Sequence, residues 1–335
     1  MRLSDPASSP ALGLDIGTSR ICLAQRSGED FHYETQLNAF VAVPFSKMTE
    51  NVLKREKVPH TTTGTDIVVH GNESDRLADL LNVETRRTMA KGVLNPAEPD
   101  SLEMMRKIIT SMIEPTRERQ KLCFTIPAAP IGAGESLTYH ETTLRQILSE
   151  LGYDVRSITE GLAVVYAELD NSNYTGIGIS CGGGLCNVCL SYLSVPVVTF
   201  SIPKAGDYID ASTAAVTGER INRVRIDKED SFHFNGFSPG KMHQVLGVYY
   251  DEMIQSIVAG MKQALASGRK MPKVGKPIPL VLSGGTALPQ GFRDRFEKVL
   301  RDGEFPLPIS EIRMATEPLH TSAKGALIAA LTDLG

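Results

Sequence analysis

Three short glycine turns carry the residues that could do chemistry in this sequence. The first, DIGTS, offers one carboxylate, two hydroxyls and a run of backbone N–H groups, from Asp15, Gly17, Thr18 and Ser19. Amides and hydroxyls arranged in this way can hold a phosphate, while the carboxylate can hold Mg²⁺ through water. Alone this match is weak, because Asp-Gly-Ser turns are common in β-hairpins.

The other two glycine turns come later in the chain. The second is the triple glycine Gly182, Gly183 and Gly184, where the backbone can approach a ligand closely because no Cβ stands in the way. The third is SGGT, from Ser283 through Gly284 and Gly285 to Thr286. It is placed where an expected strand runs into a helix, so it can present amides or a flat peptide face to a ligand.

Strands and helices are expected to alternate around the first turn. Residues 11–25 form a hairpin with DIGTS at its tip, and residues 121–127, 138–151 and 154–158 follow as strand, helix and strand. Glu160 then opens a helix of small residues. A further helix is predicted from residue 101, with Ser101 as its N-cap. The alternation argues for an α/β domain.

The same pattern then restarts. Residues 175–193 form a strand, the triple glycine and a second strand, and PVVTFSIPKAGDYID continues as a third strand and the start of a helix that contains Gly206. Residues 242–267 form a long helix, and residues 278–291 form a strand that ends in the third glycine turn. Two hairpins with glycine tips, each followed by α/β material, indicate a duplicated domain that faces itself across a cleft.

Residues 44–100 are polar and irregular and are interpreted as an inserted subdomain. Within them, PHTTTGTD at 59–66 is expected to be an exposed turn, and GNESDRLADLLN to be the start of a helix.

Composition is that of an ordinary globular protein. The 335 residues are enough for two domains, because single cores stop growing at roughly 250 to 300 residues. A formal net charge of -4 and a pI near 6.0 provide no excess of positive charge that would indicate binding to nucleic acid or to an anionic membrane. MRLSDPASSP has no amphipathic apolar face, so no membrane-inserting N-terminal helix is predicted, and no long apolar run is present. We therefore expect a cytoplasmic protein.

Three of the five cysteines, Cys181, Cys186 and Cys189, are spaced as C-x4-C-x2-C, which suggests a zinc site. No fourth ligand follows at metal spacing, and a strand would turn Cys186 and Cys189 to opposite faces. Small apolar cysteines in a buried strand are the preferred interpretation.

The order of these motifs resembles the superfamily of actin, sugar kinases and heat-shock chaperone ATPases, and within it the MreB family most closely. LDIGTSRICLA is similar to the first phosphate loop, ITEGLAVVYA to the first connecting helix and IGISCGGGLCNVCLSYL to the second phosphate loop. LVLSGGTALPQGFRDRF is similar to the adenosine motif and PLHTSAKGALIAAL to the second connecting helix. The resemblance covers essentially the whole chain.

The resemblance implies an α/β, two-lobed actin-like ATPase fold, with duplicated ribonuclease-H-like domains around a cleft that binds ATP or ADP with Mg²⁺. Asp15 would hold the metal through water. Thr18 and Ser19 would contact the β-phosphate, the triple glycine the outer phosphates, and Gly284 and Gly285 the adenosine. The full set of residues implied to bind the nucleotide is Asp15, Gly17, Thr18, Ser19, Gly182, Gly183, Gly184, Gly206, Gly284, Gly285 and Thr286.

Glu160 matches the position that orients the attacking water, and a carboxylate can accept a proton from that water. The alternative for Glu160 is a carboxylate stabilised by the helix N-terminus. Arg225 and Lys228 match the helix that contacts adenine, although a basic helix face is often only solvated.

The resemblance also implies a division of the chain. Lobe I would have a core of residues 1–43, 95–174 and 316–335 and an inserted small subdomain at 44–94. Lobe II would have a core of residues 175–217 and 240–315 and a reduced small subdomain at 218–239.

Two departures from the superfamily pattern matter. The second phosphate loop normally begins with Asp and ends with Thr, but here these positions are Ser180 and Leu185. The loss of a positioned catalytic group typically lowers a rate by orders of magnitude, whereas binding can survive because the glycines remain. The segment between Asp210 and Val281 is also shorter than in MreB, and SFHFNGFSPG takes the place of a small subdomain that contributes to filament contacts in relatives.

Our first interpretation is therefore an actin-like, nucleotide-binding cytoskeletal or scaffold protein with slow or absent ATP hydrolysis, for which self-association is possible and a protein partner is expected. The second is a chaperone-like or regulatory protein of the same fold that works without filaments. A third, a small-molecule kinase, needs a carboxylate base aimed at a substrate hydroxyl, and no acidic residue stands in a recognisable position for that role.

Overall fold

The computed structural model describes residues 11–81, 83–131, 137–235, 240–266 and 276–332. The expectations for residues 1–10, and those for residues 236–239 of the shortened segment, lie outside these ranges.

A five-stranded mixed sheet forms the centre of the first lobe. Its strands are β1 (Leu12–Ile16), β2 (Arg20–Ser27), β3 (Asp30–Leu37), β10 (Lys121–Ile126) and β11 (Asp154–Thr159), in the order β11-β10-β1-β2-β3. The three N-terminal strands pair antiparallel, while β1, β10 and β11 pair parallel. The first glycine turn therefore lies at the tip of the β1–β2 hairpin.

A second sheet repeats this arrangement. Its strands are β12 (Gly176–Cys181), β13 (Cys186–Tyr192), β14 (Val195–Ile202), β15 (Ile278–Ser283) and β16 (Ile309–Met314), in the order β14-β13-β12-β15-β16. Again the first three strands pair antiparallel and the last two join in parallel. Identical order and direction in both sheets confirm the predicted duplication of an α/β domain.

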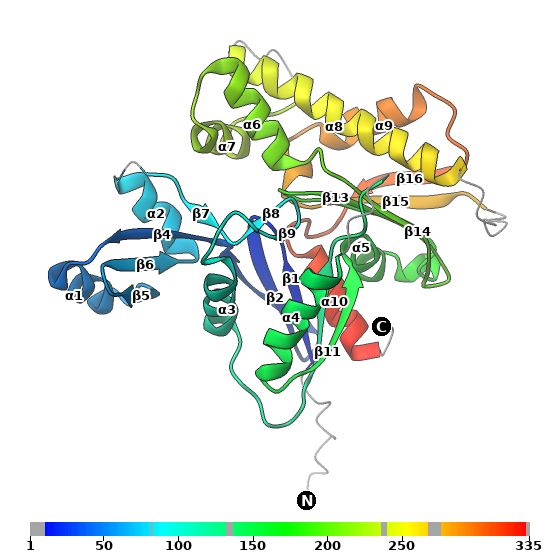
Figure 1. The fold of residues 1–335 in the computed structure, drawn as a ribbon. Coiled ribbons are helices and arrows are strands. Elements are labelled where there is room, and N and C mark those ends of the chain that lie inside the picture. Colours follow the sequence, from blue (N-terminus) through cyan, green and yellow to red (C-terminus); the bar gives the residue numbers. More distant parts are fainter. Residues whose placement is uncertain (1–10, 82, 132–136, 236–239, 267–275, 333–335) are drawn as a thin grey trace, which may run out of the picture.

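Helices cover the outer faces of both sheets. The first sheet packs against α3 (Ser101–Met112) and α4 (Thr138–Glu150). The second packs against α6 (Gly206–Thr217), α8 (Lys241–Ala266) and α9 (Phe292–Arg301), which lie above it in Figure 1 together with α7 (Ile221–Asp230). Within the described ranges no helix is long and apolar enough to cross a membrane.

Between the two sheets lie the connecting helices α5 (Glu160–Glu168) and α10 (Thr321–Thr332) (Figure 1). Their small residues form one apolar core with side chains of both sheets. Glycine makes this packing possible, because a Cβ on Gly325 would collide with the carbonyl oxygen of Ala163 on α5. A Cβ on Gly13 of β1 would collide with the α10 backbone at Ala323 and Leu327. The helices thus approach each other and β1 at backbone contact distance.

The segment predicted to be irregular is mostly regular, so that prediction is wrong. It contains the helices α1 (Lys47–Arg55) and α2 (Asn72–Leu81) and the short hairpin of β8 (Met89–Ala90) and β9 (Val93–Leu94). Its strands β5 (His60–Thr63), β6 (Asp66–His70) and β7 (Arg86–Arg87) form a small sheet with β4 (Ala39–Pro44), which comes just before the segment. The expected exposed turn at 59–66 is the β5–β6 hairpin. Helix α1 is mostly polar, and Leu53 is its one buried residue.

The predicted N-cap of α3 is wrong by one residue, because Ser101 is the first helical residue and Asp100 precedes it. The Asp100 carboxylate makes no capping hydrogen bond, since it accepts one from Arg86 at 2.8 Å instead. The prediction for β13 is confirmed: Cys186 packs in the core of the second sheet, whereas Cys189 packs in the core between the sheets.

His140 in α4 is buried and predicts a specific loss of stability in acid. Its Nδ1 accepts a hydrogen bond from the Leu94 backbone N–H at 3.2 Å, and burial lowers its pKa to about 4. The unfolded chain, with an ordinary histidine pKa, binds a proton first. The contribution of the neutral His140 to the free energy of unfolding is therefore fully present above about pH 6.5 and is lost between about pH 6.5 and pH 4.

The variant His140→Asn keeps an acceptor for Leu94 but cannot titrate. We expect wild-type protein to lose about 2 kcal/mol more unfolding free energy than this variant between pH 7 and pH 5. Urea denaturation at both pH values measures the difference. Equal losses in the two proteins would contradict the assignment.

Candidate functional site

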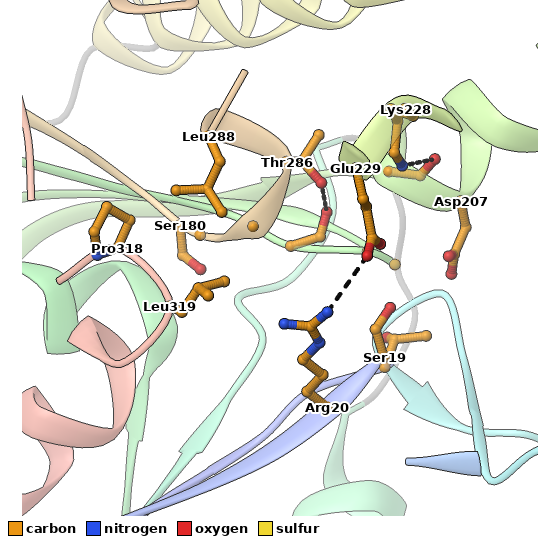
Figure 2. Close-up of a pocket in the computed structure, with 18 of the residues that line it drawn as sticks. Ser19, Arg20, Ser180, Asp207, Lys228, Glu229, Thr286, Leu288, Pro318 and Leu319 are labelled. Atoms are coloured by element: carbon orange, nitrogen blue, oxygen red, sulfur yellow. Dashed lines mark hydrogen bonds and ion pairs between the residues drawn. The ribbon is translucent and has the colours of Figure 1, made fainter. Parts of the chain in front are cut away.

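A cavity of about 530 Å³ lies between the two lobes, a size that is usual for small-molecule sites. All three glycine turns contribute to it, and Figure 2 shows side chains from both lobes directed into it. Every residue that the sequence proposed for a site lines this one cavity: Asp15, Gly17, Thr18, Ser19, Glu160, Gly182, Gly183, Gly184, Gly206, Arg225, Lys228, Gly284, Gly285 and Thr286. The cavity brings them together, and their individual roles stay a prediction.

The first two glycine turns touch each other across the interface between the lobes. A Cβ on Gly183 would collide with Ser19 Oγ, and one on Gly184 would collide with Thr18 Oγ1. The hydroxyls of the first turn therefore face the bare backbone of the second. An anion placed beside this contact would meet hydroxyls from one lobe and peptide groups from the other.

Leu185, which stands where the superfamily has Thr, makes an apolar contact between the lobes. It packs so closely on Gly92 that any Cβ at that glycine would collide with its Cδ1. The Gly92 N–H donates a hydrogen bond to Thr18 Oγ1 at 3.0 Å. The loop between β8 and β9 is thus held against both glycine turns, by a hydrogen bond on one side and by the Leu185 side chain on the other.

Two carboxyl groups that line the cavity, those of Asp15 and Glu160, interact with each other. Burial raises the pKa of Asp15 to about 6, and a hydrogen bond from Thr125 partly offsets this rise. Burial, reinforced by the negative charge of Asp15, raises the pKa of Glu160 to about 8. Ser180 Oγ donates to Glu160 Oε2 at 3.1 Å. The serine at the position of the superfamily Asp therefore holds the carboxyl group that was proposed to orient water.

Asn187 was missed by the sequence analysis and belongs to the same cluster. It pairs with Ser180 across the β12–β13 hairpin, so both side chains face Glu160. Its Oδ1 accepts from the Ala128 N–H at 2.8 Å, and its amide group lowers the pKa of Glu160. Its buried Nδ2 has no well-formed hydrogen bond. Only the strand register reveals this residue, which is why the motif pattern did not.

The third glycine turn is tied to the second. Gly284 adopts φ +93°, a left-handed conformation that favours glycine, and a Cβ there would collide with the Cys181 carbonyl. Thr286 Oγ1 donates to the Gly182 carbonyl at 2.8 Å, and the Gly206 N–H donates to the same oxygen at 3.1 Å. These bonds fix the backbone at the rear of the cavity, where Leu288, Pro318 and Leu319 add apolar surface (Figure 2).

The two basic residues proposed on α7 line the cavity but already have acidic partners. Lys228 Nζ lies 2.9 Å from the Asp210 carboxylate, and both side chains are buried. Arg225 Nη2 lies 2.7 Å from Asp75 Oδ2 of α2. Arg225 therefore links α7 to α2.

The donor set of the cavity fits Mg²⁺ held through water. In the part of the chain that the structure describes, no group of three or more His, Cys, Asp or Glu side chains could hold a metal ion directly. Asp15 and Glu160 supply two hard carboxylates, and Mg²⁺ usually keeps several waters while it takes one or two carboxylates and substrate phosphates. A bound divalent cation would also relieve the repulsion between the two groups.

A family model described as Volactin matches residues 11–330. No curated protein sequence matches the chain significantly. Among solved structures, one described as a MamK double helical filament is 17% identical with a TM-score of 0.70, and the match covers 95% of this chain and 97% of that one. MreB5 of Spiroplasma citri bound to AMPPNP is 16% identical with a TM-score of 0.64, over 98% of both chains.

The ethanolamine utilization protein EutJ from Carboxydothermus hydrogenoformans is 15% identical with a TM-score of 0.54, over 97% of this chain and 91% of that one. At these identities the likeness is one of fold. It confirms the actin-like ATPase fold and the resemblance to MreB that the motif order predicted.

The buried pair of Lys228 and Asp210 yields a stability prediction. Lys228→Met leaves the Asp210 carboxylate, whose pKa burial already raises, without its cation. We expect the unfolding free energy at pH 7 to fall by about 3 kcal/mol. The double variant Lys228→Met/Asp210→Leu removes the stranded charge and should recover most of that loss in urea denaturation. If Lys228→Met alone were as stable as the wild type, the pair of Lys228 and Asp210 would make no contribution to the free energy of unfolding.

Proposed function

The chain belongs to the Volactin family, and we propose that it is an actin-like, nucleotide-binding cytoskeletal or scaffold protein of the cytoplasm that assembles with copies of itself and hydrolyses ATP slowly or not at all. One observation carries the proposal: three glycine turns that are far apart in the sequence converge on a single cavity between two similar lobes.

The ligand that suits this cavity is ATP or ADP with Mg²⁺. Hydroxyls and backbone of the first two turns would hold the phosphates, and Asp15 would hold the metal through its water shell. The third turn and the apolar surface beside it would lie along the nucleoside. MreB5 of Spiroplasma citri, which shares the fold, has been solved with ADP and with AMPPNP. The metal neutralises phosphate charge when bound.

Slow or absent hydrolysis follows from the environment of Glu160. Ser180 donates to one of its oxygens instead of supplying a second carboxylate. The site would then hold ATP without activating the attacking water well.

Self-association is supported by the fold and by the description of a relative. MamK, which has the same fold, forms a double helical filament. The proposed division into two lobes with small subdomains at residues 44–94 and 218–239 gives the molecule two ends that copies could use for contact.

A second candidate function, a regulatory protein that does not polymerise, is favoured by the small size of the second lobe. Helix α7 ends at Asp230 and α8 begins at Lys241, so only a short segment stands where filament-forming relatives have a small subdomain. A protein of this kind would act through the conformation that the nucleotide sets.

Assembly and nucleotide binding are tested together by pelleting and light scattering with and without ATP and Mg²⁺. We expect ATP-dependent assembly of the wild-type protein and a higher melting temperature with ATP, because a ligand that binds only the folded state stabilises it. Asp15→Ala should lose both responses. Asp30→Ala, an exposed acid on β3, is the matched control and should keep both.

Two outcomes would contradict different parts of the proposal. Stabilisation by ATP without assembly at high protein concentration favours the non-polymerising alternative. Unchanged stabilisation of Asp15→Ala by ATP shows that the cavity is not the nucleotide site.

The variant Ser180→Asp tests the explanation for slow hydrolysis. It restores the second carboxylate beside Glu160, and we expect ATP turnover with Mg²⁺ to rise about tenfold or more. Ser180→Asn has similar size without the charge and should leave the rate unchanged. Phosphate release over time measures the rate. Equal rates in the wild type and Ser180→Asp would contradict the explanation that Ser180 slows hydrolysis.

A further inference from the structure

The cavity has more negative than positive charge, although its proposed ligand is a polyanion. Six acidic side chains line it, against three basic ones, from Arg20, Arg225 and Lys228. A triphosphate would therefore be repelled unless cations offset its charge. Magnesium can supply part of this compensation, and a basic side chain that is able to turn to the phosphates can supply more.

Two of the three cations are already committed to carboxylates. Lys228 forms its buried pair with Asp210, with side-chain exposures of 7% and 3%. Arg225 is held by Asp75, and its side chain is only 14% exposed. To bind a phosphate, either residue would have to leave a buried or half-buried acid without its partner, which is costly.

Arg20 differs from both in exposure and in the strength of its pairing. Its side chain is 42% exposed, and its one partner among the described residues is the 49% exposed Glu229 of α7, at 3.4 Å from Nη2. Exposed pairs of this kind contribute little, about 0 to 1 kcal/mol. The Nε and Nη1 hydrogens make no hydrogen bond to any described residue.

The position of Arg20 directs this guanidinium to the phosphate end of the cavity. It is the first residue of β2 and follows Ser19 directly, and its carbonyl oxygen accepts from the Gly17 N–H at 2.9 Å. Figure 2 shows the side chain rising from the first lobe into the cavity, next to Ser19 and toward Glu229. A phosphate held by Thr18 and Ser19 would lie within reach of its unpaired edge.

We propose that Arg20 binds the phosphates of the nucleotide through the edge of its guanidinium that Glu229 leaves unpaired. This inference rests on the proposed function. A guanidinium suits the role because its planar fork donates to two acceptors at once, and hydrogen bonds between charged groups are the stronger ones. Glu229 positions the fork from the opposite lobe.

The arrangement links the ligand to both lobes through one side chain. Arg20 belongs to β2 of the first lobe, whereas Glu229 belongs to α7 of the second. A phosphate on one edge of the guanidinium and the Glu229 carboxylate on the other would hold α7 over the cavity. Binding of phosphate, and not of the nucleoside alone, would then stabilise the contact between the lobes.

The test is calorimetric titration of the full chain with ATP, ADP and adenosine, each with Mg²⁺. Arg20→Met should weaken ATP and ADP binding about tenfold or more, since a charged hydrogen bond is lost, and should change adenosine affinity less than about twofold. Arg26→Met is the matched control, because Arg26 is an exposed arginine of the same strand that donates to the Gly28 carbonyl. It should leave all three affinities unchanged.

Each other outcome overturns a defined part of the argument. Equal losses for ATP and adenosine, or no loss for ATP, would overturn the assignment of Arg20 while leaving the proposed function intact. An equal loss in Arg26→Met would show a general charge effect and would overturn it as well. Wild-type protein that binds neither ATP nor ADP would overturn the proposed function, and the role of Arg20 with it.

Discussion

The close packing of α5 against α10 is the constraint on which the rest of the structure depends. These helices occupy the space between the two sheets, and they can do so only because Gly325 and Gly13 allow backbone to touch backbone. This contact sets the distance between the sheets. The strand ends of both lobes then come together on one side, where the three glycine turns meet.

Electrostatics and packing divide the cavity into two functional ends. In one part of the cavity, Asp15 and Glu160 have raised pKa values, and Ser180 donates a hydrogen bond to Glu160. Near the junction of the lobes, Leu185 replaces a hydroxyl with an apolar contact to Gly92. The two departures from the superfamily pattern replace a carboxylate with a hydroxyl at Ser180 and a hydroxyl with an apolar side chain at Leu185, and both leave the glycine backbone of the turn in place.

Prediction from the sequence succeeds for those parts of the site whose conformation is determined by neighbouring residues in the chain. Glycine turns at strand ends are recognisable from the sequence, so the turns and the duplicated sheets could be predicted from the pattern, whereas Glu160, Arg225 and Lys228 were proposed from the family resemblance. Helix α1 was not predicted, because the segment is mostly polar and only Leu53 in it is buried. Asn187, Arg20 and Glu229 were missed for a different reason. Their importance arises from strand register and from contacts between lobes, and Arg20 and Glu229 are 209 positions apart in the chain.

The position of α10 in the chain also determines when the first lobe can fold. Residues 321–332 follow the whole second lobe in sequence, yet they pack on β1 at Gly13 and on α5 at Ala163. Until α10 leaves the ribosome, the inner face of the first sheet, which includes Cys22, Ala24 and Cys123, lacks the part of its core that α10 supplies. The N-terminal lobe therefore cannot complete its packing before the last helix is synthesised, and contacts of long sequence separation generally form slowly. A chain interrupted before residue 321 would expose that face, which makes the nascent protein dependent on protection from aggregation.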